Sequence, residues 1–248
     1  MNVSSSVQRQ IHHSRYPRIF VALKSGKAVR AHYQGQKYRY SSTSKACRTP
    51  VSEAQLQRQA SLKAQKGHYS EALALLSQLI DQSPATAKYY NNRGLVYFYS
   101  GQPQKAQADY NRAIALDPQL TEAYNNRANY SVSIGHLQEA LADYDRAIDL
   151  NPFNIRAWIN RGITYRNLGQ YERSLDDLDF ALRLGRLTGH IYAERGRTYH
   201  RMGDWNCAVA DYQRALKQFS SLASLCSPAD QRQHLRVKTW LNELYQAC

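Results

Sequence analysis

Cysteine is scarce in this sequence, and its spacing excludes two kinds of site. The 248 residues include four cysteines, with no CxxC pair and no histidine at ligand spacing: Cys47, Cys207, Cys226 and Cys248. Neither a zinc site nor a disulfide framework is expected, and reduced thiols in a cytosol-like compartment are predicted. The adjacent His12 and His13 have no further ligands near them, so no metal is expected there either.

Long apolar runs and catalytic motifs are missing too. The longest apolar run near the start, Ile19 to Leu23, is far shorter than a membrane span or the hydrophobic part of a signal peptide. The sequence has no nucleophile elbow, phosphate-binding glycine loop or metal-spaced cluster. It therefore predicts a protein with no membrane span, no cofactor or metal, and no enzymatic activity.

Acidic residues are absent from residues 1–52, which contain ten of the 33 lysines and arginines. The remaining residues carry 23 basic and 19 acidic side chains, so the net charge of +14 belongs mainly to this N-terminal arm. Within residues 18–41, the β-prone runs RIFVALK, AVRAHY and KYRYS are separated by two predicted hairpin turns, 25–27 and 34–36. A small three-stranded meander is expected in the arm.

The composition of the arm leaves several roles open. Its basic residues alternate with aromatic ones, namely Tyr16, Phe20, Tyr33, Tyr38 and Tyr40. Cations that bind phosphates together with rings that stack on bases are the chemistry of nucleic-acid binding, which is one hypothesis. A targeting segment, such as an organellar transit peptide, and an anchor to an anionic protein or membrane surface are the others. The expected compartment is the cytoplasm, or an organelle if the arm is a transit peptide.

Beyond the arm, the sequence repeats itself. The stretch YNNRG at Tyr90–Gly94 returns as YNNRA at Tyr124–Ala128 and in part at Trp158–Gly162, 34 residues apart each time. A fixed period of this length is typical of stacked helical repeats. Five units are predicted, at residues 53–86, 87–120, 121–154, 155–188 and 189–222.

Recurring residue types predict a helical hairpin in each unit. Glycine occurs at position 15 of every unit, small residues at positions 8 and 20, and proline at position 32 of the first three units. Glycine permits the left-handed turn that reverses the chain, small residues let two helices approach closely, and proline ends the second helix. The fourth unit departs from this pattern, because Arg186 replaces its proline.

This pattern resembles the tetratricopeptide repeat (TPR), and the YNNRG copies are similar to those of cyanobacterial and related bacterial TPR proteins. The second unit carries the whole set of TPR residues: Tyr90, Gly94, Tyr97, Ala106, Tyr110, Ala113 and Pro118. The resemblance implies an all-α, right-handed superhelix of five hairpins. It also implies a non-catalytic scaffold, for example an assembly factor, that binds an extended segment of another protein in its concave groove.

The C-terminal residues 223–248 are expected to form a capping helix, because the apolar face of the last repeat needs a cover. The helix is predicted to begin at Pro228 and to present Val237, Trp240, Leu241 and Leu244 on one face.

Arginine at position 7 and aspartate at position 23 occur together in the last four units and are both missing from the first. Because these positions face each other in an antiparallel hairpin, bidentate ion pairs are expected. The predicted pairs are Arg93–Asp109, Arg127–Asp143, Arg161–Asp177 and Arg195–Asp211. A basic ladder that binds nucleic acid or phosphate is the alternative interpretation.

The family resemblance implies that positions 2, 5, 6, 9, 12 and 13 line the groove, where asparagine amides can bind a partner's main chain. The candidate groove residues are Asn91, Asn92, Asn125, Asn126, Asn129, Asn160, Tyr99, Arg156, Arg166, Arg197 and Arg201. The early units are more apolar and the later units more basic, which predicts a partner with an apolar end and an acidic end or free carboxylate. Binding of chaperone tails is disfavoured, because His190 and Glu194 stand where such TPR proteins carry Lys and Arg.

Overall fold

The computed structural model describes residues 32–33, 36–37, 52–221 and 228–247, and the chain divides into two units, Met1–Pro50 and Val51–Cys248. In the first unit, β1 (His32–Tyr33) pairs antiparallel with β2 (Gln36–Lys37), with His32 opposite Lys37. The second strand thus begins at Gln36, a residue that the sequence assigned to the turn. The rest of the predicted meander lies outside the described residues.

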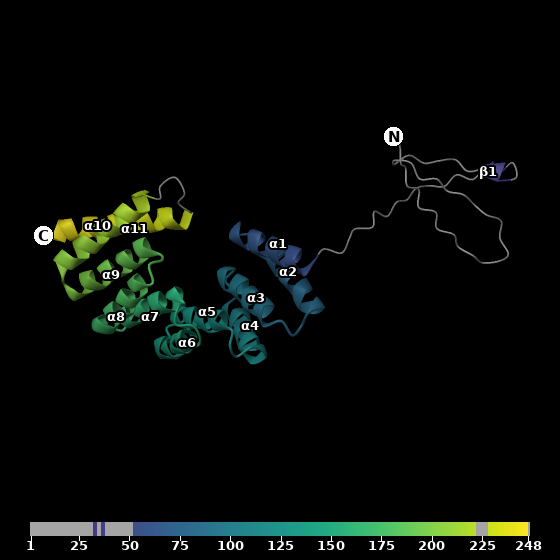
Figure 1. Ribbon diagram of the computed structural model, residues 1–248, viewed down its shortest axis with the longest axis horizontal. Helices are drawn as coiled ribbons and strands as arrows, with labels where there is room; N and C mark the ends of the chain where they lie inside the picture. The colour runs from purple at the N-terminus through teal and green to yellow at the C-terminus, as the bar shows by residue number, and fades with distance from the viewer. Residues whose placement is uncertain (1–31, 34–35, 38–51, 222–227, 248) are drawn as a thin grey trace, which may run out of the picture. The chain divides into compact units, whose positions relative to one another are not determined.

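The described part of the second unit consists of helices that pack as consecutive antiparallel hairpins (Figure 1). They are α1 (Glu53–Gln65), α2 (Tyr69–Gln82), α3 (Ala87–Tyr99), α4 (Pro103–Leu116), α5 (Thr121–Ser133), α6 (Leu137–Leu150), α7 (Ile155–Asn167), α8 (Tyr171–Arg183), α9 (Thr188–Met202), α10 (Trp205–Ser221) and α11 (Pro228–Ala247). Each predicted repeat unit contains one hairpin. The all-helical repeat fold expected from the sequence is confirmed.

Glycine and small residues act as the spacing predicts. The position-15 glycines turn the chain within each hairpin with φ values between +75° and +86°. Gly94 lets two helices approach, since a Cβ at this position would lie 2.8 Å from the ring of the buried Tyr110. The equivalent position of the fifth unit, Gly196, meets the ring of Tyr212 at the same distance. The apolar core consequently runs along the stack as a series of clusters, within and between neighbouring hairpins.

The arginine at position 7 joins three helices. Arg93 donates from Nε and Nη2 to the two carboxylate oxygens of Asp109, both at 2.8 Å. The same bidentate geometry joins Arg127 to Asp143, Arg161 to Asp177 and Arg195 to Asp211, with distances of 2.6–2.9 Å.

The third nitrogen of each arginine, Nη1, reaches back to position 25 of the preceding unit. Its acceptors are Ser77 for Arg93, Asn111 for Arg127, Asp145 for Arg161 and Asp179 for Arg195. Sequence reasoning missed this contact. The signal lay in the spacing, because the second partner is 16 residues before the arginine and the first is 16 residues after it.

Burial makes these ion pairs costly as well as specific. Asp177 is buried, and desolvation raises the pKa of its carboxyl although the hydrogen bonds from Arg161 lower it. The guanidinium of Arg161 also lies 4.8 Å from the ring centre of Trp158, which shields it further from water. Such pairs specify geometry more than they add stability, because desolvation offsets much of the attraction.

Asp143→Ala should therefore lower the free energy of unfolding by about 3 kcal/mol, because Arg127 keeps a half-buried charge without its main partner. The double replacement Arg127→Leu with Asp143→Leu should cost less than this single change, since neither charge is then left behind. Urea unfolding of both variants measures the difference. An equal or larger cost for the double variant would contradict the pairing argument.

The junction after the fourth unit has an unusual backbone. Where the first three junctions have proline, this one has Gly185 at φ +70° and Leu187 at φ +56°. A left-handed conformation costs a residue with a Cβ about 1–2 kcal/mol. The backbone is strained at Leu187, whose side chain is 43% exposed and contributes little packing in return.

Leu187→Asn should therefore raise the free energy of unfolding by about 0.5–1 kcal/mol, because asparagine tolerates the left-handed region. Leu62→Asn is the matched control, since Leu62 is similarly exposed, at 46%, but lies inside the right-handed helix α1. The control should lose stability in thermal unfolding. A loss for Leu187→Asn as well would show that its backbone is not strained.

Helix α11 covers the end of the stack. Val237, Trp240 and Leu244 are buried in one cluster with residues of α9 and α10, including Tyr212 and Phe219. Two polar contacts at the helix surface join α11 to α9: a hydrogen bond between His190 and Asp230 at 2.7 Å, and an ion pair from Arg197 to Glu243 at 3.3 Å. The predicted face of the capping helix is thus the face that it buries.

Removal of residues 227–248 should expose this cluster and make the protein aggregate, because in the described part of the chain α11 is the helix that covers this face of the last hairpin. A chain lacking only residues 245–248 keeps all three buried side chains and should stay monomeric. Size-exclusion chromatography with light scattering distinguishes the two. A longer truncate that is monomeric and melts cooperatively would refute the capping role.

Candidate functional site

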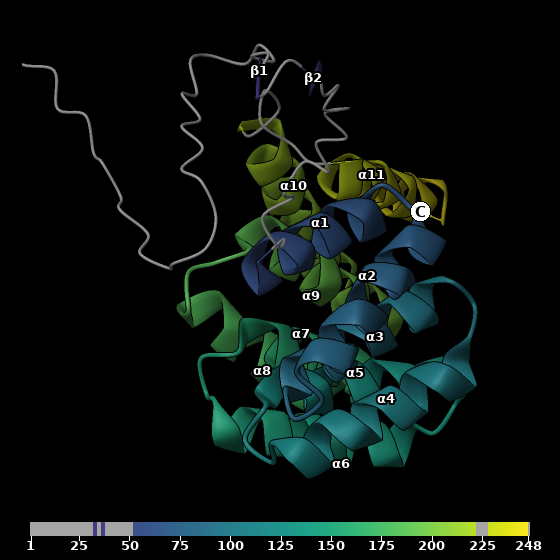
Figure 2. The same ribbon diagram turned by 90° about the vertical axis from the view of Figure 1, so that its right-hand side faces the viewer.

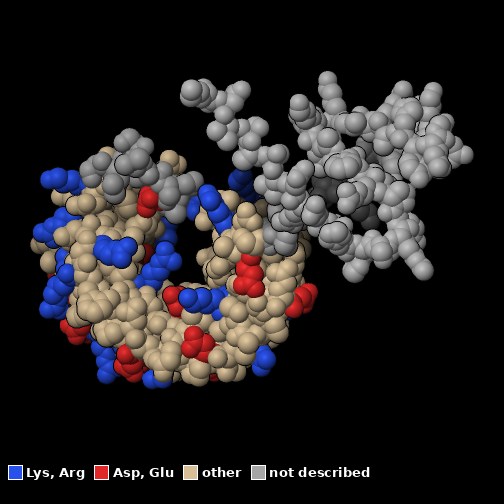
Figure 3. Space-filling model, turned by 45° about the vertical axis from the view of Figure 1, so that its right-hand side comes forward, with Lys and Arg blue, Asp and Glu red and all other residues tan. Residues whose placement is uncertain are grey.

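The first helices of the second to fifth units form one continuous surface. Contacts join α3 to α5, α5 to α7 and α7 to α9 directly. In Figure 2 these helices lie on the inner side of the curved stack, with α4, α6 and α8 outside them. Figure 3 shows that the stack surrounds a hollow into which charged side chains reach. We call the inner side of α3, α5, α7 and α9 the concave surface.

Asparagines on the concave surface bind one another between units. Asn126 donates from Nδ2 to Oδ1 of Asn91 at 2.9 Å, and Asn160 donates to Oδ1 of Asn125 and of Asn129 at 3.3 and 3.0 Å. Asn91 is buried, and its Nδ2 donates a longer hydrogen bond, of 3.4 Å, to Oδ1 of the next residue, Asn92. Sequence reasoning treated these amides as free for a partner and missed the bonds between them.

The position-6 asparagines nevertheless keep binding capacity. Asn92, Asn126 and Asn160 are half-buried, each with part of its side chain open to solvent. An asparagine offers two N–H donors and one carbonyl acceptor. Within the described chain, Oδ1 of Asn126 and Oδ1 of Asn160 accept no hydrogen bond. The bonds between units therefore hold the amides in fixed orientations while leaving acceptors exposed.

The arginines of the concave surface fall into two groups. Arg166 donates from Nη1 to the carboxylate of Glu194 at 2.9 Å and to its carbonyl oxygen at 3.0 Å. Arg197 pairs with Glu243 and lies over the ring of Trp240 at 5.0 Å. The exposed Arg156 and Arg201 make no hydrogen bond or ion pair within the described residues. Ion pairs within the fold therefore neutralise part of the positive charge at the basic end of the surface. The pairing of Arg197 with Glu243 was not predicted from the sequence.

An aromatic pair lies toward the other end of the surface. The rings of Phe98 and Tyr99 meet edge to face with centres 5.8 Å apart, and Tyr99 is 63% exposed. An exposed ring of this size is a strong apolar contact for a partner. The structure thus places this aromatic pair on α3 and the exposed Arg201 on α9, while the gradient as a feature of partner binding stays a prediction.

Burial affects the titratable groups next to the basic end. It lowers the pKa of His200, an effect that the neighbouring Arg197 increases. It also raises the pKa of Tyr212 to about 12. Both shifts favour the uncharged forms of these side chains, and the charged groups beside them are the arginines with Glu194 and Glu243.

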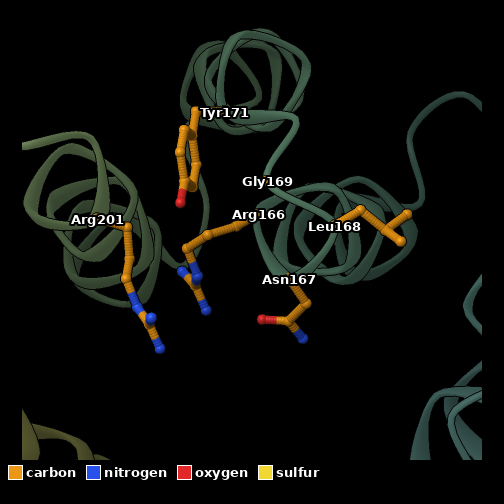
Figure 4. A pocket seen from close by; sticks show the side chains of 6 residues that line it. All are labelled: Arg166, Asn167, Leu168, Gly169, Tyr171 and Arg201. Atoms are coloured by element: carbon orange, nitrogen blue, oxygen red, sulfur yellow. The ribbon is translucent and has the colours of Figure 1, made fainter.

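A pocket of about 490 Å³ lies between α7, α8 and α9, at the edge of the concave surface (Figure 4). Its lining consists of Arg166, Asn167, Leu168, Gly169, Tyr171 and Arg201. Two of these, Arg166 and Arg201, are sequence-predicted groove residues that the structure brings together. Tyr171 was missed because it begins the second helix of its hairpin, outside the positions that line a TPR groove.

Two further features are absent from the described residues. No group of histidine, cysteine, aspartate and glutamate side chains in that part of the chain is arranged to hold a metal ion. None of its helices is both long enough and apolar enough to span a bilayer.

Tetratricopeptide repeat family models match residues 87–120, 121–154 and 143–176. The first two matches coincide with the second and third units defined by the 34-residue period, and each of these units holds one hairpin of the structure. The chain is a tetratricopeptide repeat protein. TPR solenoids bind their partners on the extended concave surface that stacked repeats create.

Solved structures share this TPR fold. TTC0263, a TPR protein of Thermus thermophilus, is 22% identical with a TM-score of 0.65, and the match covers 76% of this chain and 98% of that one. The pilF protein of Pseudomonas aeruginosa is 18% identical with a TM-score of 0.60, covering 79% and 93%. MamA is 21% identical with a TM-score of 0.55, covering 70% and 94%. No curated protein sequence matches the chain.

Proposed function

We propose that this TPR protein is a non-catalytic scaffold that binds an extended segment of another protein along its concave surface. The observation that carries the proposal is the row of asparagine amides on α3, α5 and α7, held in register by hydrogen bonds between units. A main chain presents N–H and C=O groups at regular spacing whatever its sequence, and fixed amides are suited to bind it. Orientation before binding lowers the entropy cost of association.

The side chains at the two ends of the concave surface differ, which favours a partner segment that binds in one chain direction. The exposed ring of Tyr99 and its neighbour Phe98 favour an apolar side chain at the α3 end. Arg201, exposed at the α9 end, favours an acidic group. Together these features select a segment that is apolar near one end and acidic near the other, and assembly of a larger complex is one role for such a scaffold.

The position-7 arginines do not support nucleic-acid binding by the stack. Each of the four position-7 guanidiniums already pairs with a buried carboxylate and donates to a polar group of the preceding unit, which disfavours a role in binding phosphates. The nucleic-acid hypothesis therefore depends on the basic arm, most of which lies outside the described residues.

The triple replacement of Asn92, Asn126 and Asn160 by Ala should weaken partner binding about 100-fold, because three hydrogen bonds of about 1 kcal/mol each are lost. The matched control replaces Gln104, Gln138 and Gln213 by Ala, which are exposed amides on the outer helices. Proteins retained on the immobilised wild type and on each variant are compared by quantitative mass spectrometry, after thermal melts establish that the variants are folded. Retention of the same proteins by all three would overturn the proposal.

A further inference from the structure

The pocket between α7, α8 and α9 gathers hydrogen-bond donors on one opening. In Figure 4 the guanidiniums of Arg166 and Arg201 and the amide of Asn167 point to the same open side, and the hydroxyl of Tyr171 points toward the two arginines. The side chain of Leu168 points away from them. Gly169 and Tyr171 line the pocket from the start of α8, where the helix dipole adds partial positive charge.

Three of these donors are unused and the fourth is held in place. Arg201, Asn167 and Tyr171 make no side-chain hydrogen bond within the described residues. Arg166 is fixed through Nη1 on Glu194, and its Nε and Nη2 have no acceptor in that part of the chain. Polar groups that face one opening without a partner are arranged for a ligand that accepts hydrogen bonds.

The repeats themselves show that this arrangement is particular to one junction. The pocket occupies positions 12, 13 and 17 of the fourth unit and position 13 of the fifth. In the second unit the same positions hold Phe98, Tyr99 and Pro103, followed by Ser133. In the third they hold Val132, Ser133 and Leu137, followed by Asn167. Two guanidiniums meet only between the fourth and fifth units, so the regular packing of the stack does not require them.

We propose that this pocket binds a carboxylate group of the partner segment, an inference that rests on the scaffold function proposed above. A carboxylate is an acceptor with two oxygens, which matches guanidinium donors in bidentate geometry. Because Glu194 offsets one of the two arginine charges, the pocket has a net charge of about +1, which suits a singly charged carboxylate better than a doubly charged phosphate.

The pocket is formed by other repeat positions than the carboxylate clamp that the family resemblance implies for TPR proteins that bind chaperone tails. Such a clamp uses positions 2, 5, 6 and 9, and here His190 and Glu194 occupy two of them. Within this fold His190 pairs with Asp230 of α11, and Glu194 pairs with Arg166. Among the residues that line the pocket, the guanidinium with no partner in the described part of the chain is therefore that of Arg201.

The distance between the two ends of the surface restricts the partner. Neighbouring helices in contact have axes about 8–10 Å apart, so the three steps from α3 to α9 cover roughly 24–30 Å. An extended chain covers about 3.3 Å per residue. A carboxylate in the pocket and an apolar side chain at Tyr99 should thus be separated by roughly seven to nine residues.

Immobilised pools of ten-residue peptides test the proposal, with phenylalanine at one end and a randomised interior, made in both chain directions. The other end carries aspartate, asparagine or phosphoserine, with the C-terminus amidated, and a further pool ends in glycine with a free carboxylate. The full-length wild type should bind an aspartate or free-carboxylate pool at least about tenfold more tightly than the asparagine pool. The comparison of those two pools tells a side-chain carboxylate from a terminal one.

Arg201→Gln should reduce this preference to about twofold or less, while Arg146→Gln, which removes an exposed charge from the outer helix α6, should leave it unchanged. Equal binding of the aspartate, free-carboxylate and asparagine pools would overturn the carboxylate site but not the scaffold. Tighter binding of the phosphoserine pool would overturn the choice of carboxylate. Binding of no pool at all would overturn both proposals, and an equal effect of the two variants would show that only overall charge matters.

Discussion

The position-7 arginine is the interaction on which the regularity of the stack depends. One planar guanidinium binds an aspartate of its own hairpin through two nitrogens and a polar group of the preceding hairpin through the third. A bidentate pair permits a narrow range of angles between the helices that carry it. Repeated in four units, this bridge sets both the geometry inside each hairpin and the offset from one hairpin to the next.

Because these bridges lie between the helices, the concave surface is free to vary along the stack. The asparagine row also joins neighbouring units, since Asn126 and Asn160 each donate to asparagines of the preceding unit. Away from that row, aromatic side chains occupy the edge at α3 and guanidiniums occupy it at α9. A regular stack whose surface changes from aromatic side chains at α3 to guanidiniums at α9 suits the proposed binding of one segment in one direction.

The sequence predicted the repeat fold well because its signals are local and periodic. The position-15 glycines turn the chain at every hairpin. The pairing of Arg93 with Asp109 was predicted because arginine at position 7 and aspartate at position 23 occur in the same units. Contacts between units were harder to predict. Ser77, Asn111, Asp145 and Asp179 share a position but differ chemically, so no repeated residue type marks them as one set of acceptors. Leu187 likewise has nothing in its residue type that indicates a left-handed backbone.

By itself, the sequence determined the period, the hairpin, the capping face of α11 and which residue types occupy the concave surface. These properties depend on residues close in the chain or at fixed spacing, where backbone geometry decides which residues meet. Only the tertiary structure decided which polar groups are already bound and which are open. Arg166 and Arg201 are 35 residues apart, and one is held by Glu194 while the other is unpaired among the described residues. That difference arises from how neighbouring hairpins pack, and the proposed carboxylate site depends on it.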